Sequence, residues 1–163
     1  MLHRRQLIAT VSAIPALLLA PAVHAAWSTG ETVALPPLAL LDGSQLDVAA
    51  LKGKVVVVQF WASWCPFCAK QNPLIEALYR AHRSRGLEVV SISIDKTPAA
   101  ASEYMRSKGY TFRAVMVTPA WNAIFRLRKG LPQVYVIGRD GRVLQSEMGE
   151  MFEEDVKGIA RHL

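Results

Sequence analysis

The strongest constraint on the fold of this chain is a pair of cysteines that directly follows an apolar run. Cys65 and Cys68 are the only two cysteines among the 163 residues. They follow the run Val55–Trp61, in which Gln59 is the only polar residue. An apolar pattern on both faces predicts a central strand that is covered by helices. The order strand, short turn, Cys-x-x-Cys, helix places both thiols at a helix N-terminus, where free backbone N–H groups and the helix dipole favour a thiolate.

The spacing of the two cysteines favours a reactive role over a structural one. A disulfide across so short a loop removes little entropy from the unfolded chain. At the tip of the helix, Cys65 is the expected exposed nucleophile, and Cys68, one turn further on the same face, is the expected less exposed thiol that resolves a mixed disulfide. Pro66 suits the first helical turn and Phe67 adds an apolar edge, while Ser63 is the expected N-cap.

Residues 1–25 predict a secretory signal peptide. Two arginines at positions 4 and 5 precede the apolar stretch Leu7–Ala20, and a small-residue cleavage site stands before Ala26. The arginine pair also permits twin-arginine export. The alternative is an uncleaved N-terminal membrane anchor, although the stretch is short for a span and carries a proline. Cleavage would leave one domain, residues 26–163, in the periplasm or another exported compartment.

The charge pattern excludes one large class of function. The formal net charge is +6 at pH 7. The cations form no dense basic run interleaved with aromatic residues, which is typical of nucleic-acid grooves, so no nucleic-acid partner is expected. The hydrophobic content of 52% includes the predicted signal and therefore does not indicate a membrane protein.

Strand-like and helix-like patterns alternate along the rest of the chain. An Asp-Gly turn at Asp42-Gly43 predicts a small hairpin, and Pro73 is expected to kink the first long helix. Strands followed by helices, and then a terminal hairpin and helix, predict an α/β fold with a mixed sheet between helices. The expected strands are 38–41, 45–48, 55–61, 87–94, 112–117, 133–138 and 142–147, and the expected helices are 65–83, 97–108, a short one from 118 and a last one from near Glu150.

A proline at the start of the strand at 133–138 is the second informative feature. Pro132 is tolerable there only at a sheet edge or in a special turn. A cis peptide bond would present the Leu131 backbone to a partner strand, whereas an ordinary trans proline is the alternative. Arg126, Arg128 and Lys129 precede this loop; if they fold near the dithiol they favour its thiolate, and a solvated basic turn is the alternative.

Several motifs together resemble one known family. They are Leu51–Lys54, the run Phe60-Trp61-Ala62-Ser63-Trp64-Cys65-Pro66-Phe67-Cys68, the segment Gly130-Leu131-Pro132 and Ile137–Gly141. On these residues the chain resembles the thioredoxin superfamily, and within it the exported TlpA/ResA/DsbE-like branch. The resemblance implies a thioredoxin-like mixed β-sheet flanked by helices on both faces, with an N-terminal hairpin and an inserted helix and strand over Thr97–Val117.

The resemblance also assigns roles to individual residues. It implies that Cys65 is the nucleophile, that Cys68 is the resolving thiol, and that Pro132 is a cis-proline facing them. The residues expected to support the two cysteines are Trp61, Trp64, Pro66, Phe67, Leu131, Pro132, Gln59 and Gln71.

Two of these positions depart from the family pattern. Gln59 stands where thioredoxins usually carry a buried aspartate, and Gln71 stands where many members of the branch carry a glutamate. Glutamine can form hydrogen bonds but cannot take up the proton of a buried thiol. We therefore expect an ordered water or another group to serve Cys68, with a steeper dependence of its activation on pH.

The function implied is that of a thiol–disulfide oxidoreductase acting through a mixed disulfide. Within the branch, this means reduction of particular protein disulfides, such as those of apocytochromes c, with electrons from a membrane thiol donor of the DsbD/CcdA type. The redox-active disulfide is the only expected cofactor, no metal is expected, and a monomer is expected.

Three other functions are alternatives to the reduction of protein disulfides. The same dithiol could act as an oxidant that inserts disulfides, and the reduction potential separates the two directions. A peroxiredoxin is disfavoured, because its pattern needs Pro at Val58 and Thr at Ala62. A copper carrier is disfavoured, because only His82 and His162 lie outside the predicted signal and both are poorly placed for it.

Overall fold

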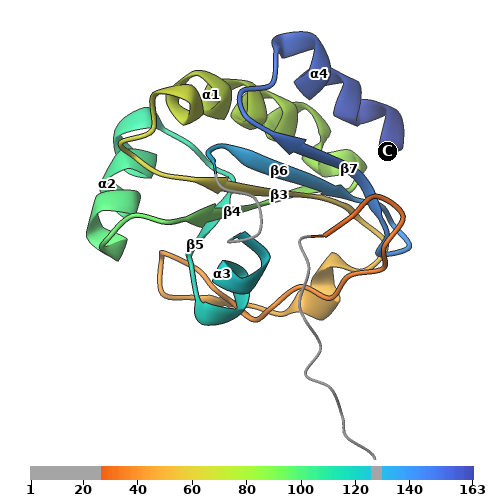
Figure 1. Ribbon diagram of the computed structural model, residues 1–163, viewed down its shortest axis with the longest axis horizontal. Helices are drawn as coiled ribbons and strands as arrows, with labels where there is room; N and C mark the ends of the chain where they lie inside the picture. Colours follow the sequence, from red (N-terminus) through yellow and green to blue (C-terminus); the bar gives the residue numbers. More distant parts are fainter. Residues whose placement is uncertain (1–26, 126–129) are drawn as a thin grey trace, which may run out of the picture.

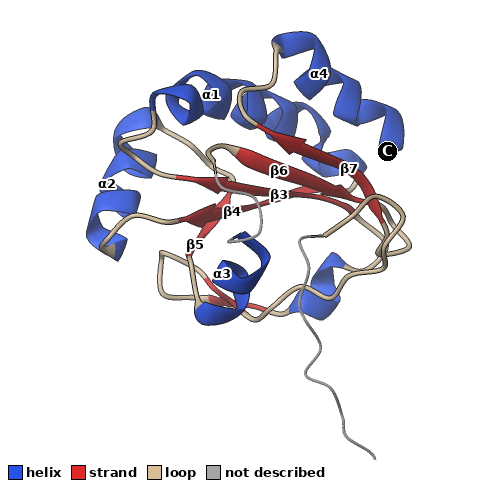
Figure 2. Ribbon diagram, viewed as in Figure 1, coloured by secondary structure: helices blue, strands red, loops and turns tan. Residues whose placement is uncertain are grey.

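The computed structural model describes residues 27–125 and 130–163. The predicted signal at 1–25 and the cations Arg126, Arg128 and Lys129 lie outside the described residues. Figures 1 and 2 show a twisted sheet between two layers of helices and loops. Among the helices of the described ranges, none has the length and apolar character needed to cross a bilayer.

The sheet is mixed and its centre is the predicted apolar strand. Five strands lie in the order β5-β4-β3-β6-β7. The central strand β3 pairs in parallel with β4 and antiparallel with β6, while β5 is parallel to β4 and β7 is antiparallel to β6. The strands are β3 Val55–Trp61, β4 Leu87–Ser93, β5 Arg113–Met116, β6 Gln133–Ile137 and β7 Val143–Met148.

Alternate residues of the central strand feed two separate cores. Val55 and Val57 belong to the core under one set of helices, and Val56, Val58 and Phe60 belong to the core on the opposite face. All seven residues of β3 are buried. A strand with apolar side chains on both faces is stable only when both faces are covered, so the pattern read from the sequence matches this architecture.

Helices cover both faces of the sheet. One core includes side chains of α1 (Pro66–His82), α2 (Pro98–Lys108) and α4 (Glu153–Gly158). The other includes side chains of α3 (Pro119–Phe125), of the 3-10 helix Val48–Leu51 and of the N-terminal segment. The predicted thioredoxin-like α/β fold is thereby confirmed, and α2 with β5 forms the inserted helix and strand.

The predicted N-terminal hairpin is present but shorter than expected. It consists of β1 (Leu38–Ala39) paired antiparallel with β2 (Gln45–Leu46). The second strand ends early because the chain enters the 3-10 helix Val48–Leu51, whose first turn is capped by the carboxylate of Asp47. The Leu41 N–H donates to the Ala114 carbonyl oxygen at 2.9 Å, which attaches the hairpin to β5.

One helix prediction needs correction, and one stays a prediction. The last helix begins at Glu153 rather than near Glu150, because the Asp155 carboxylate accepts a hydrogen bond from the Phe152 N–H at 3.2 Å and fixes the start there. Pro73 lies inside α1, as expected, and the kink there stays a prediction. The helix continues to His82 before a 3-10 turn and Gly86, at φ 90°, close it.

Candidate active site

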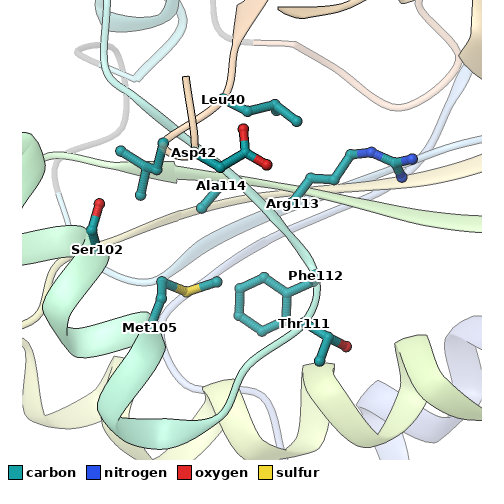
Figure 3. A pocket seen from close by; sticks show the side chains of 9 residues that line it. Leu40, Asp42, Ser102, Met105, Thr111, Phe112, Arg113 and Ala114 are labelled. Carbon is teal, nitrogen blue, oxygen red and sulfur yellow. The ribbon is translucent and has the colours of Figure 1, made fainter. Parts of the chain in front are cut away.

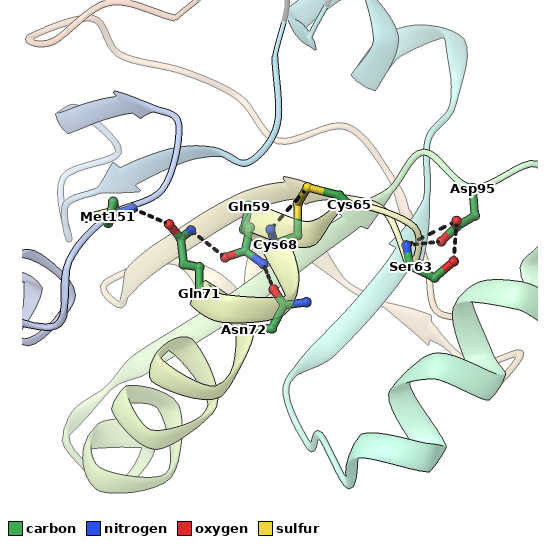
Figure 4. Close-up of a disulfide and its surroundings, with 8 residues drawn as sticks. All are labelled: Gln59, Ser63, Cys65, Cys68, Gln71, Asn72, Asp95 and Met151. Atoms are coloured by element: carbon green, nitrogen blue, oxygen red, sulfur yellow. Dashed lines mark hydrogen bonds between the residues drawn. A yellow bond between two sulfur atoms is a disulfide. The ribbon is translucent and has the colours of Figure 1, made fainter.

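The two cysteines form a disulfide at the N-terminus of α1. Their Cα atoms are 5.2 Å apart. Cys65 is itself the N-cap of the helix, and its Sγ accepts a hydrogen bond from the Cys68 N–H at 3.1 Å (Figure 4). The expectation that Ser63 caps this helix was therefore wrong. A free backbone donor of the first turn points at the sulfur of Cys65, which is where a thiolate would gain most from it.

The exposure of the two sulfur-bearing residues differs less than expected. Cys65 is 4% exposed and Cys68 is fully buried. The order is the predicted one, but Cys65 is not an open surface residue in the disulfide form. Its neighbours Trp64 and Phe67 are large apolar residues that are exposed, at 66% and 51%. The approach to the disulfide therefore lies over two large apolar side chains.

The remaining tryptophan of the motif has a structural place. Trp61 is completely buried at the end of β3, and its ring lies 5.3 Å from that of Tyr104, measured between centroids. Tyr104 belongs to α2, so this contact joins the inserted helix to the strand that leads into the dithiol.

The Leu131–Pro132 loop lies at the same end of the sheet as the dithiol. Its peptide bond is cis, and Pro132 is buried while Leu131 is half-buried. Gln133, the first residue of β6, pairs with Phe60 near the end of β3, so the residues before Gln133 and those after Phe60 emerge together. The Pro132 carbonyl oxygen accepts a hydrogen bond from Gly149 N–H at 2.9 Å, which ties the loop to the end of β7.

A chain of buried amides crosses behind the disulfide. The Met151 N–H donates to Gln71 Oε1 at 2.8 Å, and Gln71 Nε2 donates to Gln59 Oε1 at 3.1 Å. Gln59 Nε2 then donates to Asn72 Oδ1 at 2.6 Å (Figure 4). All three side chains are completely buried. The two glutamines that depart from the family pattern are thus bonded to each other, in a chain that holds no group able to take up a proton near neutral pH.

Two residues of this site were missed in the sequence. Asn72 ends the amide chain, and its Nδ2 has no hydrogen-bond partner among the described residues. Asp95 lies just beyond β4, is 5% exposed, and accepts hydrogen bonds from both the N–H and the hydroxyl of Ser63. A polar residue at the carboxyl end of a strand parallel to β3 is a signal that could have indicated Asp95.

The cations and histidines of the described residues differ in their distance from the site. Lys70 lies over the Phe67 ring, 5.6 Å from its centroid, and is 3.4 Å from the Glu150 carboxylate. His82 ends α1, and at a rise of 1.5 Å per residue it lies about 25 Å from the start of that helix. Burial lowers the pKa of a second histidine, His162. The histidine of α1 therefore stands far from the dithiol.

A separate pocket lies away from these residues. Figure 3 shows it between the N-terminal hairpin, α2 and β5, with Met105 and Phe112 among its apolar lining and Asp42 and Arg113 among its charged side chains. None of the predicted site residues lines it.

A dithiol that caps the helix after the central strand of such a sheet defines the thiol–disulfide oxidoreductases with a thioredoxin-like fold. The comparison with family models agrees: the chain belongs to the Redoxin family, whose model matches residues 19–163.

The chain is also similar to individual thiol–disulfide oxidoreductases. The thiol-disulfide oxidoreductase ResA of Bacillus thuringiensis (strain Al Hakam) is 29% identical over 124 residues, which cover 76% of this chain and 71% of the relative. ResA of Bacillus subtilis (strain 168) is 30% identical over 112 residues, which cover 69% of this chain and 63% of the relative.

Solved structures give the same result. A thioredoxin-family thiol:disulfide interchange protein of Chlorobium tepidum TLS is 26% identical, with a TM-score of 0.75 over 83% of this chain and 97% of that one. A secreted disulfide oxidoreductase of Mycobacterium tuberculosis, homologous to E. coli DsbE, shares the fold at 21% identity and a TM-score of 0.67, over 78% of this chain and 95% of that one.

The chain is therefore a thiol–disulfide oxidoreductase of the Redoxin family that is similar to ResA. The roles of the individual site residues stay predictions.

Proposed function

We propose that this protein is exported and reduces disulfide bonds of other proteins by two successive exchange steps. The observation that carries the proposal is the unequal placement of the two sulfurs. The Cys68 N–H donates to Cys65 Sγ at 3.1 Å, whereas Cys68 is fully buried one turn further along the same helix. Both cysteines are nearly closed to solvent in the disulfide form, but Cys65 keeps the larger exposure, 4%, and its sulfur has the backbone donor that would stabilise a thiolate.

In the first step, the Cys65 thiolate attacks one sulfur of the partner's disulfide. A Cys65–partner disulfide forms, the partner's own bond breaks, and the released partner sulfur leaves as a thiolate that takes up a proton. In the second step, Cys68 loses its proton and attacks Cys65 Sγ, which closes the Cys65–Cys68 disulfide and releases the second partner thiol. Two electrons pass from the dithiol to the partner.

The oxidised protein must then be reduced by another dithiol. We assign this role to a membrane thiol donor of the DsbD/CcdA type. The proposed substrates include the disulfides of apocytochromes c, and the proposed working form is the monomer. Export is supported by the signal predicted at residues 1–25. It also agrees with the Mycobacterium tuberculosis disulfide oxidoreductase that shares this fold, which is a secreted protein.

The experiment is a trap. In the Cys68→Ser variant the second step cannot occur, so incubation of the reduced variant with a peptide disulfide should accumulate a mixed disulfide at Cys65, detected by mass. The wild-type protein should release both peptide thiols, and the Cys65→Ser variant should give no adduct. No adduct in Cys68→Ser would contradict the proposed mechanism.

The direction of electron flow is tested separately by the reduction potential. A value near the thioredoxin end, about −270 mV, supports a reductant, and a value near about −120 mV supports the alternative, an oxidant that inserts disulfides.

A further inference from the structure

The carboxylate of Asp95 is almost completely buried and accepts its hydrogen bonds from two serines. Asp95 is 5% exposed. It accepts from the Ser63 N–H at 3.1 and 3.2 Å to its two oxygens, and from the Ser63 hydroxyl at 2.8 Å. The Ser93 hydroxyl donates to it at 2.8 Å and accepts from the Asp95 N–H at 3.0 Å. Across the described ranges, no lysine, arginine or histidine forms an ion pair with it.

These bonds reach the turn that carries the nucleophile. Trp61 of β3 is in register with Ser93 of β4, and the Ile94 N–H donates to the Trp61 carbonyl oxygen at 2.9 Å. The two chains therefore continue side by side beyond the sheet, which brings Asp95 to Ser63. The Cys65 N–H in turn donates to the Ala62 carbonyl oxygen at 3.1 Å. Ser63 lies inside that turn, two residues before Cys65.

A buried carboxylate here has two possible effects on Cys65, and they have opposite signs. As a negative charge it would oppose a thiolate nearby and raise the pKa of the thiol. As an anchor it would fix the turn, so that Cys65 Sγ stays in line with the Cys68 N–H and the thiolate is favoured. In Figure 4 the contact between Asp95 and Ser63 lies on the opposite side of the disulfide from Gln71 and Met151.

We propose that Asp95 is a positioning residue: through Ser63 it holds the turn Ala62–Cys65 in the conformation in which the Cys65 sulfur caps α1. This rests on the proposed function, since it concerns the reactivity of the same nucleophile. The charge of Asp95 is a cost that the enclosing hydrogen bonds offset, because three neutral donors satisfy its two oxygens.

The test measures the alkylation of Cys65 against pH in the Cys68→Ser background, where Cys65 is the only thiol and the backbone N–H of residue 68 remains. Iodoacetamide is the probe. The added Asp95→Ala substitution should raise the pKa of the Cys65 thiol and slow alkylation at pH 6 about tenfold. Such a loss is one pKa unit.

Asp95→Asn is the conservative variant that separates position from charge. Its Oδ1 still accepts from the Ser63 N–H and the Ser63 hydroxyl, and the Ser93 hydroxyl, which faces the other position, can rotate to accept from Nδ2. Alkylation should stay within about twofold of the parent. Unchanged alkylation in Asp95→Ala, or faster alkylation in both variants, would overturn the proposal. An Asn variant as slow as the Ala variant would also overturn it, because the charge itself would then be required.

Two further variants keep the test decisive if Asp95→Ala does not fold. Ser63→Ala removes only the hydroxyl bond and should slow alkylation in the same direction by a smaller factor. Glu76→Gln is the matched control: it is another buried carboxylate that holds backbone N–H groups, on Thr111 and Phe112, three turns along α1 from the dithiol. It should lower the melting temperature and leave the Cys65 alkylation profile unchanged.

The parent protein distinguishes failure of the positioning role from failure of the proposed function. If Cys65 in the Cys68→Ser parent does not react near neutral pH, the proposed function fails. If it reacts and the Asp95 and Ser63 variants match it, only the positioning role fails.

Discussion

The buried side chain of Gln71 is held by hydrogen bonds at both the oxygen and the nitrogen of its amide. Its Oε1 accepts from the Met151 N–H and its Nε2 donates to Gln59 Oε1. An amide satisfies both contacts, whereas a carboxylate can only accept. The glutamine at this position therefore suits the neighbouring glutamine, and the two departures from the family pattern have one physical explanation.

This pairing leads to a prediction for Gln71→Glu. The new carboxylate keeps the bond to Met151 but faces Gln59 Oε1 and is buried, so its pKa should lie above about 4.3. It can then accept the proton of Cys68. The rate of the second exchange step should be less steep with pH in the variant than in the wild type, between pH 5 and 8.

The measurement for Gln71→Glu is stopped-flow release of the partner from a pre-formed Cys65 mixed disulfide. In the wild type the rate should rise about tenfold per pH unit below the pKa of Cys68, because no buried group takes its proton. Gln71→Met, which cannot take up a proton, is the control for lost packing and hydrogen bonds. Identical profiles for Gln71→Glu and the wild type would contradict the prediction.

At the scale of elements, α1 is attached to the loop before β5 by one carboxylate. Glu76 is 7% exposed and accepts from the Thr111 N–H at 2.8 Å, the Thr111 hydroxyl at 2.7 Å and the Phe112 N–H at 3.3 Å. Burial raises the pKa of Glu76, but the hydrogen bonds from Thr111, Arg80 and Phe112 outweigh it and leave the pKa below its ordinary value of 4.5.

The lowered pKa of Glu76 predicts how stability depends on pH. A carboxyl group with a folded pKa below its unfolded one stabilises the fold above the unfolded pKa, and that contribution is lost as pH falls through the folded pKa. The melting temperature of Glu76→Gln should therefore be lower than that of the wild type at pH 7, and the difference should shrink below about pH 4. A constant difference from pH 7 to pH 3 would contradict this.

Elements with a strong local signal could be predicted from the sequence. The strand Val55–Trp61 was predicted with the bounds that the structure has, because its side chains are apolar on both faces. The helix after it was predicted nearly to its end, and Thr97 and Gly109 mark the two ends of α2 as expected. These signals depend on residues close together in the chain.

Contacts between distant residues could not be predicted in this way. Ser63 has the residue type of an N-cap, but α1 begins at Pro66, so Cys65 stands at the N-cap position. The N–H and hydroxyl of Ser63 instead donate to Asp95, 32 residues away. The link from Gln71 to Met151 spans 80 residues. Local sequence favours the nearby partner, and the folded sheet decides which distant partner competes with it.

At the scale of the whole molecule, the site is formed where several connections meet at one end of the sheet. The turn after β3, the end of β4, the loop before β6 and the segment after β7 contribute Cys65, Asp95, Pro132 and Met151. Exposed apolar side chains lie next to these connections: Trp64 and Phe67 at the dithiol, Met148 at the end of β7, and Phe152 after it. This end of the molecule is where a partner protein would meet the disulfide.

The proposed mechanism requires that Cys65, and not Cys68, carries the sulfur that reacts with other molecules. Its most direct test is alkylation of the fully reduced protein near pH 7, followed by mass mapping of the modified cysteine. We expect rapid modification of Cys65, with Cys68 left free at short times. Preferential modification of Cys68, or a Cys65 that stays inert while the protein is folded and reduced, would contradict it.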